Sequence, residues 1–325
     1  MKKFTSENRR SSRYYYSYDS GLARRSRLKI AVFGSGLLLL PVAAVALAFI
    51  QAPSAQVPSQ KIYHQSSLAS TSTLRAPVAQ SQLASTTAQS LPLENARLST
   101  LVSRFAGSDP SHQWSVQVQG LGSDTRSASY NAAQKFNSAS MYKLLLIYPL
   151  LQKNDFDSWS KITLGVNGRL EKLSDCVATM LRTSDNACGD AVGEYVGWGY
   201  ADAELKDLGL LSTSINSAAG PSTTAVDAAT YLKGLYDGQW VSGTARDFIL
   251  GQMSQQIYRS GIPAGVGSAA TVADKIGDLG FVRHDAGIIS YSGGNYILSI
   301  FTSGASYSQI AQLTSLVQNT MSESY

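Results

Sequence analysis

Apolar residues recur with regular spacing from residue 93 to the end of the chain, which predicts a folded domain over residues 93–325. Residues 98–105 show the spacing of one helical face, and residues 114–118 alternate as in a half-buried strand. The same criteria predict helices over residues 141–151, 175–181, 187–196, 225–235, 245–253 and 307–321, and strands over residues 271–276, 286–290 and 296–301.

The order of these elements predicts the fold class. A helix and a strand come first, helices fill the middle, and strands and a last helix follow. Separate runs of strands and helices are typical of α+β domains. We therefore expect an antiparallel sheet built from both ends of the domain, with helices packed against it.

Residues 30–50 form an uninterrupted apolar stretch of 21 residues without a charge, which is about the length needed to cross a bilayer. Nine Lys and Arg precede it, which places the N-terminus inside the cell and everything after residue 50 outside. A cleaved signal peptide is the alternative, because residues 46–48 read Ala-Leu-Ala. The 29-residue leading tail and the long apolar stretch favour an uncleaved anchor.

Charge is distributed unevenly. Residues 1–50 carry a net charge of +7 from nine Lys and Arg against two acids, whereas the whole chain carries +5, so the remainder carries −2. The basic balance thus belongs to a tail, and the domain offers no nucleic-acid surface. Residues 51–92 are dominated by Ser, Thr, Gln, Ala and Pro, which predicts a disordered linker between membrane and domain.

The first candidate chemical motif is Ser140-Met141-Tyr142-Lys143, which leads into an apolar run. On a helix, Ser140 and Lys143 lie one turn apart on the same face. A serine hydroxyl needs a neighbouring base to become a nucleophile, and a lysine of lowered pKa can supply one. The pair alone is also compatible with an ordinary helix start and a solvated lysine.

A second candidate motif, Ser184-Asp185-Asn186, falls between two predicted helices, where a short turn can project a hydroxyl and an amide into a cleft. Taken alone, these residue types are equally typical of a helix N-cap. A third candidate is Lys275-Ile276-Gly277 on a predicted strand, where Gly277 would let a ligand approach the backbone closely. An exposed lysine on an edge strand is its alternative interpretation.

The order of the three motifs is S-x-x-K, then S-D-N, then K-x-G, and in this order they resemble the signature of class A β-lactamases and penicillin-binding proteins. The segments over residues 223–238 and 257–265 are also similar to that family, and the likeness covers residues 96–321. It implies a β-lactamase/transpeptidase-like fold, with a helical subdomain beside the antiparallel sheet.

The resemblance also implies roles for individual residues. Ser140 would be acylated, with Lys143 as its base partner, and Ser184 would relay a proton to the leaving nitrogen. Asn186 would hold the amide side chain of the substrate. The carboxylate of the substrate would lie against Lys275, beside Gly277, and the backbone N–H groups of Ser140 and Asp278 would form the oxyanion hole.

Three departures from the family pattern bear on turnover. Where the family carries E-x-x-L-N, residues 212–216 read Ser-Thr-Ser-Ile-Asn, and no glutamate lies between Glu204 and Lys275. Ile276 replaces the hydroxyl residue of K-T-G, and the segment between Lys143 and Ser184 is shorter than the family's. These departures fit an enzyme that is acylated readily and hydrolyses the acyl-enzyme slowly, as a penicillin-binding protein does.

Metal chemistry is not expected, because the three histidines and two cysteines do not form a ligand set, and no cofactor is implied. Cys176 and Cys188 flank the S-D-N motif. In an exported domain, this pair is compatible with a disulfide or with two buried thiols. Arg283 is a candidate second cation for a carboxylate, or an ordinary surface arginine.

The leading hypothesis is an extracytoplasmic serine hydrolase that forms an acyl-enzyme with β-lactams or with D-alanyl-D-alanine cell-wall peptides. Its partners would be that substrate, the membrane through one helix, and peptidoglycan. The alternative is a wall-binding domain that keeps the fold without turnover. A tethered spacer without pocket chemistry would require all three motifs to be accidental.

Overall fold

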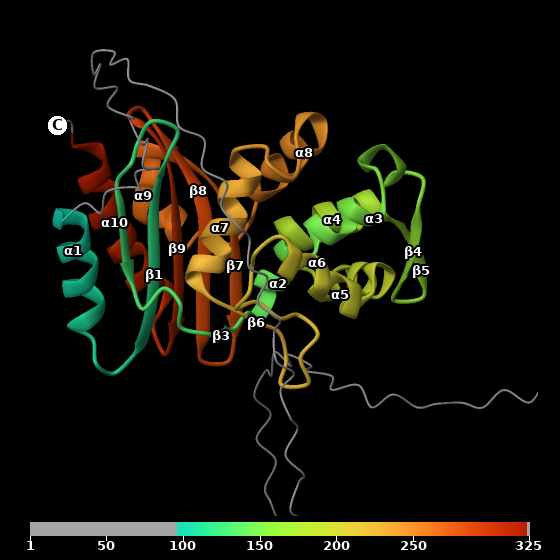
Figure 1. The fold of residues 1–325 in the computed structure, drawn as a ribbon, viewed down its shortest axis with the longest axis horizontal. Coiled ribbons are helices and arrows are strands. Elements are labelled where there is room, and N and C mark those ends of the chain that lie inside the picture. The colour runs from blue at the N-terminus through green and yellow to red at the C-terminus, as the bar shows by residue number, and fades with distance from the viewer. Residues whose placement is uncertain (1–95, 324–325) are drawn as a thin grey trace, which may run out of the picture. The chain divides into compact units, whose positions relative to one another are not determined.

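The computed structural model describes residues 96–323, and a five-stranded antiparallel sheet forms the centre of this part (Figure 1). The strand order is β2-β1-β9-β8-β7, so the first strand pairs with the last, as expected for a sheet built from both ends of the domain. The strands are β1 Gln113–Leu121, β2 Ser127–Tyr130, β7 Ala270–Leu279, β8 Val282–Tyr291 and β9 Gly294–Ser303.

Helices cover both faces of the sheet (Figure 1). On one face, α1 (Ala96–Gly107) and α10 (Tyr307–Ser322) share an apolar core with Val116, Leu298 and Ile300. The core on the other face joins α7 (Ala225–Tyr236) to alternate strand residues such as Ile297 and Phe301. Successive side chains of a strand point to opposite faces, so strands covered on both sides read as continuous apolar runs.

A helical subdomain lies beside the edge strand β7 (Figure 1). It is built around α4 and α5, whose buried residues join the core under α7. Its elements are α3 Ile147–Lys153, β4 Thr163–Val166, β5 Arg169–Lys172, α4 Leu173–Arg182, α5 Asn186–Val196 and α6 Trp198–Asp207. Two further helices are α8 Gly243–Ser254 and α9 Ile262–Val266. The predicted α+β class with flanking helices and a helical subdomain is therefore confirmed.

The prediction of one continuous helix over residues 141–151 is wrong. The chain forms a 3₁₀ turn, Ala139–Met141, then the short helix α2 (Tyr142–Leu145), and then α3. Pro149 in α3 has no N–H with which to continue the hydrogen bonding, which favours a break. The apolar patterns did not predict several short elements, including the two-residue strands β3 Phe136–Asn137 and β6 Ser222–Thr223.

The predicted tail (1–29), membrane span (30–50) and linker (51–92) lie outside the described residues. Over residues 96–323, no helix is both long enough and apolar enough to cross a membrane.

Candidate active site

Ser140 lies in the 3₁₀ turn that follows β3, and its side chain is partly exposed. The residue before it, Ala139, has a φ of +45°, a left-handed conformation that costs a non-glycine residue on the order of 1–3 kcal/mol. The side chain of Asn137 stabilises this turn, because its Oδ1 accepts the Ala139 N–H at 2.8 Å. The backbone thus bends sharply next to the predicted nucleophile.

Lys143 projects from α2 back to Ser140. Its Nζ donates to the Ser140 Oγ at 2.7 Å and to Asn186 Oδ1 at 2.8 Å, and the side chain is completely buried. Gly189 on α5 makes room for it, since a Cβ atom there would lie 2.7 Å from the Lys143 Cε. Burial excludes the solvated lysine that the isolated motif allowed.

Burial lowers the pKa of Lys143 from 10.5 to about 8. The low-dielectric surroundings disfavour the ammonium form, while the negative charges of Asp190 and Asp185 oppose this shift. An amine of this pKa is partly free of its proton near neutral pH. Lys143 can therefore accept the hydroxyl proton of Ser140.

The S-D-N motif forms the predicted short turn between α4 and α5. Asp185 is the N-cap of α5, with its Oδ1 accepting the Cys188 N–H at 2.8 Å, so capping accounts for one residue of the three. Ser184 has a φ of +57°, and this left-handed residue turns the chain between the two helices. Its hydroxyl and the Asn186 amide are then free to meet the two lysines of the site.

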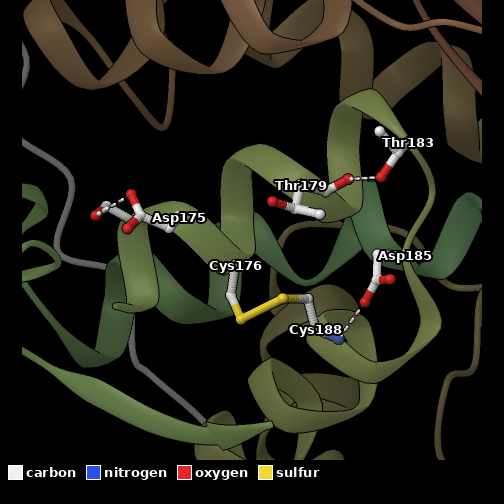
Figure 2. The surroundings of a disulfide bond; sticks show 7 residues. Asp175, Cys176, Thr179, Thr183, Asp185 and Cys188 are labelled. Atoms are coloured by element: carbon white, nitrogen blue, oxygen red, sulfur yellow. Dashed lines mark hydrogen bonds between the residues drawn. A yellow bond between two sulfur atoms is a disulfide. The ribbon is translucent and has the colours of Figure 1, made fainter. Parts of the chain in front are cut away.

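A disulfide joins Cys176 on α4 to Cys188 on α5, with Cα atoms 4.9 Å apart (Figure 2). Of the two states that the sequence left open, the structure therefore has the disulfide. Figure 2 shows the bridge spanning the two helices, with the turn that carries Asp185 at their joined ends. The S-D-N turn is thus enclosed in a covalent loop.

Lys275 lies on β7 on the other side of this turn. Its Nζ donates to Ser184 Oγ at 2.8 Å and to the Ile276 carbonyl at 2.8 Å, and its side chain is fully buried. Burial lowers the pKa of Lys275 well below its usual range, and the positive charge of Lys143 adds to that effect. The two serine–lysine pairs therefore belong to one electrostatic site, and the alternative of an exposed edge lysine is excluded.

A buried acidic pair lies behind Lys275, and the sequence patterns did not reveal it. Asp274 accepts hydrogen bonds from Arg259, at 3.0 Å, and from Gln256. Burial raises the pKa of Asp274 to about 7, and burial together with the Asp274 charge raises the pKa of Asp285 well above its usual range. These shifts favour the protonated form of Asp285, and Asp274 is the partner that faces Arg259.

Gly277 and Asp278 continue β7 past Lys275. A Cβ atom at Gly277 would lie 2.9 Å from the Ser138 carbonyl oxygen, so the nucleophile turn itself occupies the space that a side chain would need.

Asp278 is exposed, with its Oδ2 3.9 Å from the Arg283 Nε, and Arg283 also donates to the Ala305 carbonyl. A half-buried cation therefore does lie beside the predicted site.

Two departures from the family pattern, Ile276 and the loop over residues 212–216, can be located in the structure. Ile276 is buried, on the strand face opposite Lys275. The Ser212 N–H donates to Asp227 Oδ2 on α7 at 3.0 Å, and the Ile215 N–H donates to Asp202 on α6 at 2.6 Å. In the described part of the chain, this loop is therefore tied to α6 and α7 and makes no hydrogen bond to Ser140 or Lys143.

No group of three or more His, Cys, Asp and Glu side chains within residues 96–323 is arranged to hold a metal ion.

Comparison with known proteins identifies a matching family and several structures with this fold. The model of the β-lactamase enzyme family matches residues 96–321. The structure of PBP-A superposes with a TM-score of 0.64 at 20% identity, covering 70% of this chain and 97% of that one. A PBP-A mutant, described as an acyl-enzyme complex with penicillin G, gives 0.63 at 21% identity over 70% and 97%.

Two β-lactamases give similar values. The TLA-3 extended-spectrum β-lactamase superposes with a TM-score of 0.63 at 18% identity, covering 69% of this chain and 99% of that one. The β-lactamase from Sphaerobacter thermophilus gives 0.60 at 17% identity over 68% and 94%. At these identities the structural likeness establishes the fold. No curated protein matches the sequence.

Proposed function

This chain belongs to the β-lactamase enzyme family, a family of serine hydrolases, and from that premise we propose that it forms an acyl-enzyme through Ser140. Its substrates are β-lactams or the D-alanyl-D-alanine ends of cell-wall peptides. The observation that carries this proposal is the 2.7 Å hydrogen bond between Lys143 Nζ and Ser140 Oγ, made by a lysine whose pKa burial lowers to about 8.

Acylation would use these residues in a definite order. Lys143 takes the hydroxyl proton of Ser140 as Oγ attacks the carbonyl carbon, and the backbone N–H groups of Ser140 and Asp278 stabilise the oxyanion. The carbon–nitrogen bond then breaks, Ser184 gives its proton to the leaving nitrogen, and the proton that Lys143 took from Ser140 is passed on to Ser184. Lys275, hydrogen-bonded to Ser184 at 2.8 Å, faces the substrate carboxylate, whose negative charge favours the ammonium form of this buried lysine. Water finally hydrolyses the ester and restores Ser140.

We place this reaction outside the cytoplasm. The support is the uncharged 21-residue stretch over residues 30–50, preceded by a tail rich in Lys and Arg. Cell-wall peptides are found there, and a polar linker of residues 51–92 would give the domain reach toward them.

A binding domain without chemistry is the second candidate, and the glutamate missing from residues 212–216 favours it. The two candidate functions differ in whether they require the buried lysines Lys143 and Lys275. A buried ammonium group is costly, and binding alone gives no reason to hold Lys143 against Ser140. We therefore favour the hydrolase.

Intact-mass analysis after exposure to penicillin G tests the proposal. The wild-type domain should gain the mass of one penicillin, and Ser140→Ala should gain none while keeping its melting temperature. Ser138→Ala is the matched control, because Ser138 is buried two residues earlier and its hydroxyl donates to the neighbouring Ala139 carbonyl. It should still be acylated. An adduct on Ser140→Ala would refute the assignment, and a wild type without any adduct would favour the binding domain.

A further inference from the structure

His284 is buried on β8, directly beneath the predicted active site, and the proposed reaction does not use it. Its ring stacks on Phe301 with centroids 4.3 Å apart and meets the edge of Phe136 at 5.7 Å. A hydrophobic residue could fill this apolar position at a lower free-energy cost, since a buried imidazole must find hydrogen-bond partners.

Both ring nitrogens of His284 have partners, and these partners determine the tautomer. Nδ1 accepts the Thr302 N–H at 3.2 Å and therefore carries no proton. Nε2 lies 2.7 Å from the carbonyl oxygen of Asn137, which can only accept, so the proton is on Nε2. Burial lowers the pKa of His284 to about 4, which keeps the ring neutral at physiological pH.

The carbonyl that His284 holds belongs to the turn of the nucleophile. Asn137 is the last residue of β3, and its side chain accepts the N–H of Ala139, the left-handed residue immediately before Ser140. Fixing the Asn137 peptide therefore fixes both ends of this short strained turn. Without the imidazole donor, the Asn137 carbonyl would lose its hydrogen bond to Nε2.

The same ring also packs against β7. A Cβ atom at Gly277 would lie 3.0 Å from His284 Cδ2, so the strand backbone rests on the ring just before Asp278. His284 therefore contacts both chain segments whose N–H groups, at Ser140 and Asp278, would form the oxyanion hole. A single rigid side chain can in this way hold the spacing between the two segments.

We infer that His284 is a positioning residue for acyl transfer, acting as a neutral spacer that holds the Ser140 turn against the Lys275 strand. This inference rests on the proposed function. An oxyanion hole stabilises the transition state more than the bound substrate, so the spacer should affect the acylation rate constant and leave non-covalent substrate binding unchanged.

Two variants separate the roles of the two ring nitrogens of His284. In His284→Asn, the amide reaches only as far as Nδ1, so the Thr302 contact can persist while the bond to Asn137 is lost. In His284→Gln, the longer amide reaches the position of Nε2 and can donate to Asn137. We expect the Asn variant to lose about 10- to 100-fold in acylation rate constant, the size of a small misplacement of reacting groups. The Gln variant should stay within about threefold of wild type.

Stopped-flow acylation by a chromogenic β-lactam measures the rate constant and the non-covalent dissociation constant separately. The dissociation constants should agree among wild type and both variants. Equal rate constants for the Asn variant and wild type would overturn the inference, and so would a loss confined to the dissociation constant.

Hydrogen–deuterium exchange provides a readout that needs no acylation, so it tests the spacer even if the proposed function fails. The peptide covering residues 136–141 should exchange faster in His284→Asn than in wild type and at the wild-type rate in His284→Gln. Unchanged exchange in the Asn variant would overturn the inference. If neither variant folds, ¹⁵N NMR of the wild-type imidazole decides, because a proton on Nδ1 at neutral pH would contradict the spacer.

Discussion

The Lys143 Nζ lies between two side-chain oxygens, 2.7 Å from Ser140 Oγ and 2.8 Å from Asn186 Oδ1, in a fully buried position. Desolvation lowers the pKa of this lysine to about 8, and the base form is the form that can activate Ser140. We therefore expect the acylation rate to rise about tenfold per pH unit below pH 8 and to level off above it. A lysine with its ordinary pKa would continue the rise beyond pH 10.

A pH series of acylation rates between pH 5.5 and 10 measures this inflection. Asp190→Asn is the informative variant, because the negative charge of Asp190 raises the pKa of Lys143. Removing that charge should move the inflection to lower pH. An inflection that stays in place would mean that another group controls the rate.

Lys275→Met should weaken the binding of carboxylate-bearing substrates by about 10- to 100-fold, the usual range for loss of a charge-assisted hydrogen bond. The methyl ester of penicillin G lacks this carboxylate, so its binding should change little. Comparing the acid with the ester separates recognition from general damage to the fold. Lys135→Met, at an exposed position before β3, is the control and should bind both ligands normally. An equal loss for acid and ester would contradict the role given to Lys275.

Loss of the disulfide should reduce both stability and acylation. Cys176 and Cys188 are 12 residues apart and enclose the S-D-N turn, and closing a loop of this length contributes about 3 kcal/mol. For a domain of this size that corresponds to roughly 6–12 °C in melting temperature. Calorimetry on the double variant Cys176→Ala/Cys188→Ala, and on reduced wild type, measures the effect. Acylation should slow as well, because the left-handed Ser184 loses its covalent support; unchanged stability and rate would show that packing alone holds the turn.

Sequence patterns predicted the elements with long, regular apolar spacing. The strands β7, β8 and β9 extend the predicted ranges by one to four residues at each end, and helix α10 extends its predicted range by one residue. Short elements were missed, because two residues such as Phe136 and Asn137 show no period, and α6 buries little more than Ala201 and Leu205. The break before α3 was missed because the apolar run continues across it.

The candidate site residues were predicted from the order of the motifs, whereas their surroundings were not predicted. Nothing in the spacing of Asp274 and Asp285 indicates that two carboxyl groups share a buried site, since β7 and β8 bring them together only in the sheet. His284 likewise looked like an isolated histidine in the sequence. One of its partners, Thr302, lies on the neighbouring strand β9, but the other, Asn137, is 147 residues away along the chain.

Protease treatment of intact cells tests the proposed topology. Added protease should cut within residues 51–92, where Ser, Thr, Gln, Ala and Pro dominate, and release a soluble fragment that still acylates. A variant in which a structured spacer replaces residues 51–92 should resist release. Recovery of the intact protein in the cytosolic fraction would rule out both the anchor and the exported location.

Hydrolysis of the acyl-enzyme should be much slower than its formation, because the loop over residues 212–216 offers no carboxylate for the attacking water. The two aspartates that contact this loop make structural hydrogen bonds. Asp202 and Asp227 accept the N–H groups of Ile215 and Ser212, so each is held by the loop backbone. General-base catalysis is typically worth ~10² to 10⁴ in rate, and its absence should let the ester accumulate.

We therefore expect a burst of about one equivalent of β-lactam opened per enzyme, followed by a slow steady phase, as is typical of an accumulating acyl-enzyme. Quench-flow with mass detection measures the burst amplitude and the adduct lifetime together. Ser212→Glu should speed the slow phase if its carboxylate reaches the ester, and Ser212→Gln is the matched control, with similar size and no base. Because Ser212 donates to Asp227 through its backbone, both substitutions can keep that anchor. Rapid multiple turnover by the wild type, with no detectable adduct, would show that another group supplies the base.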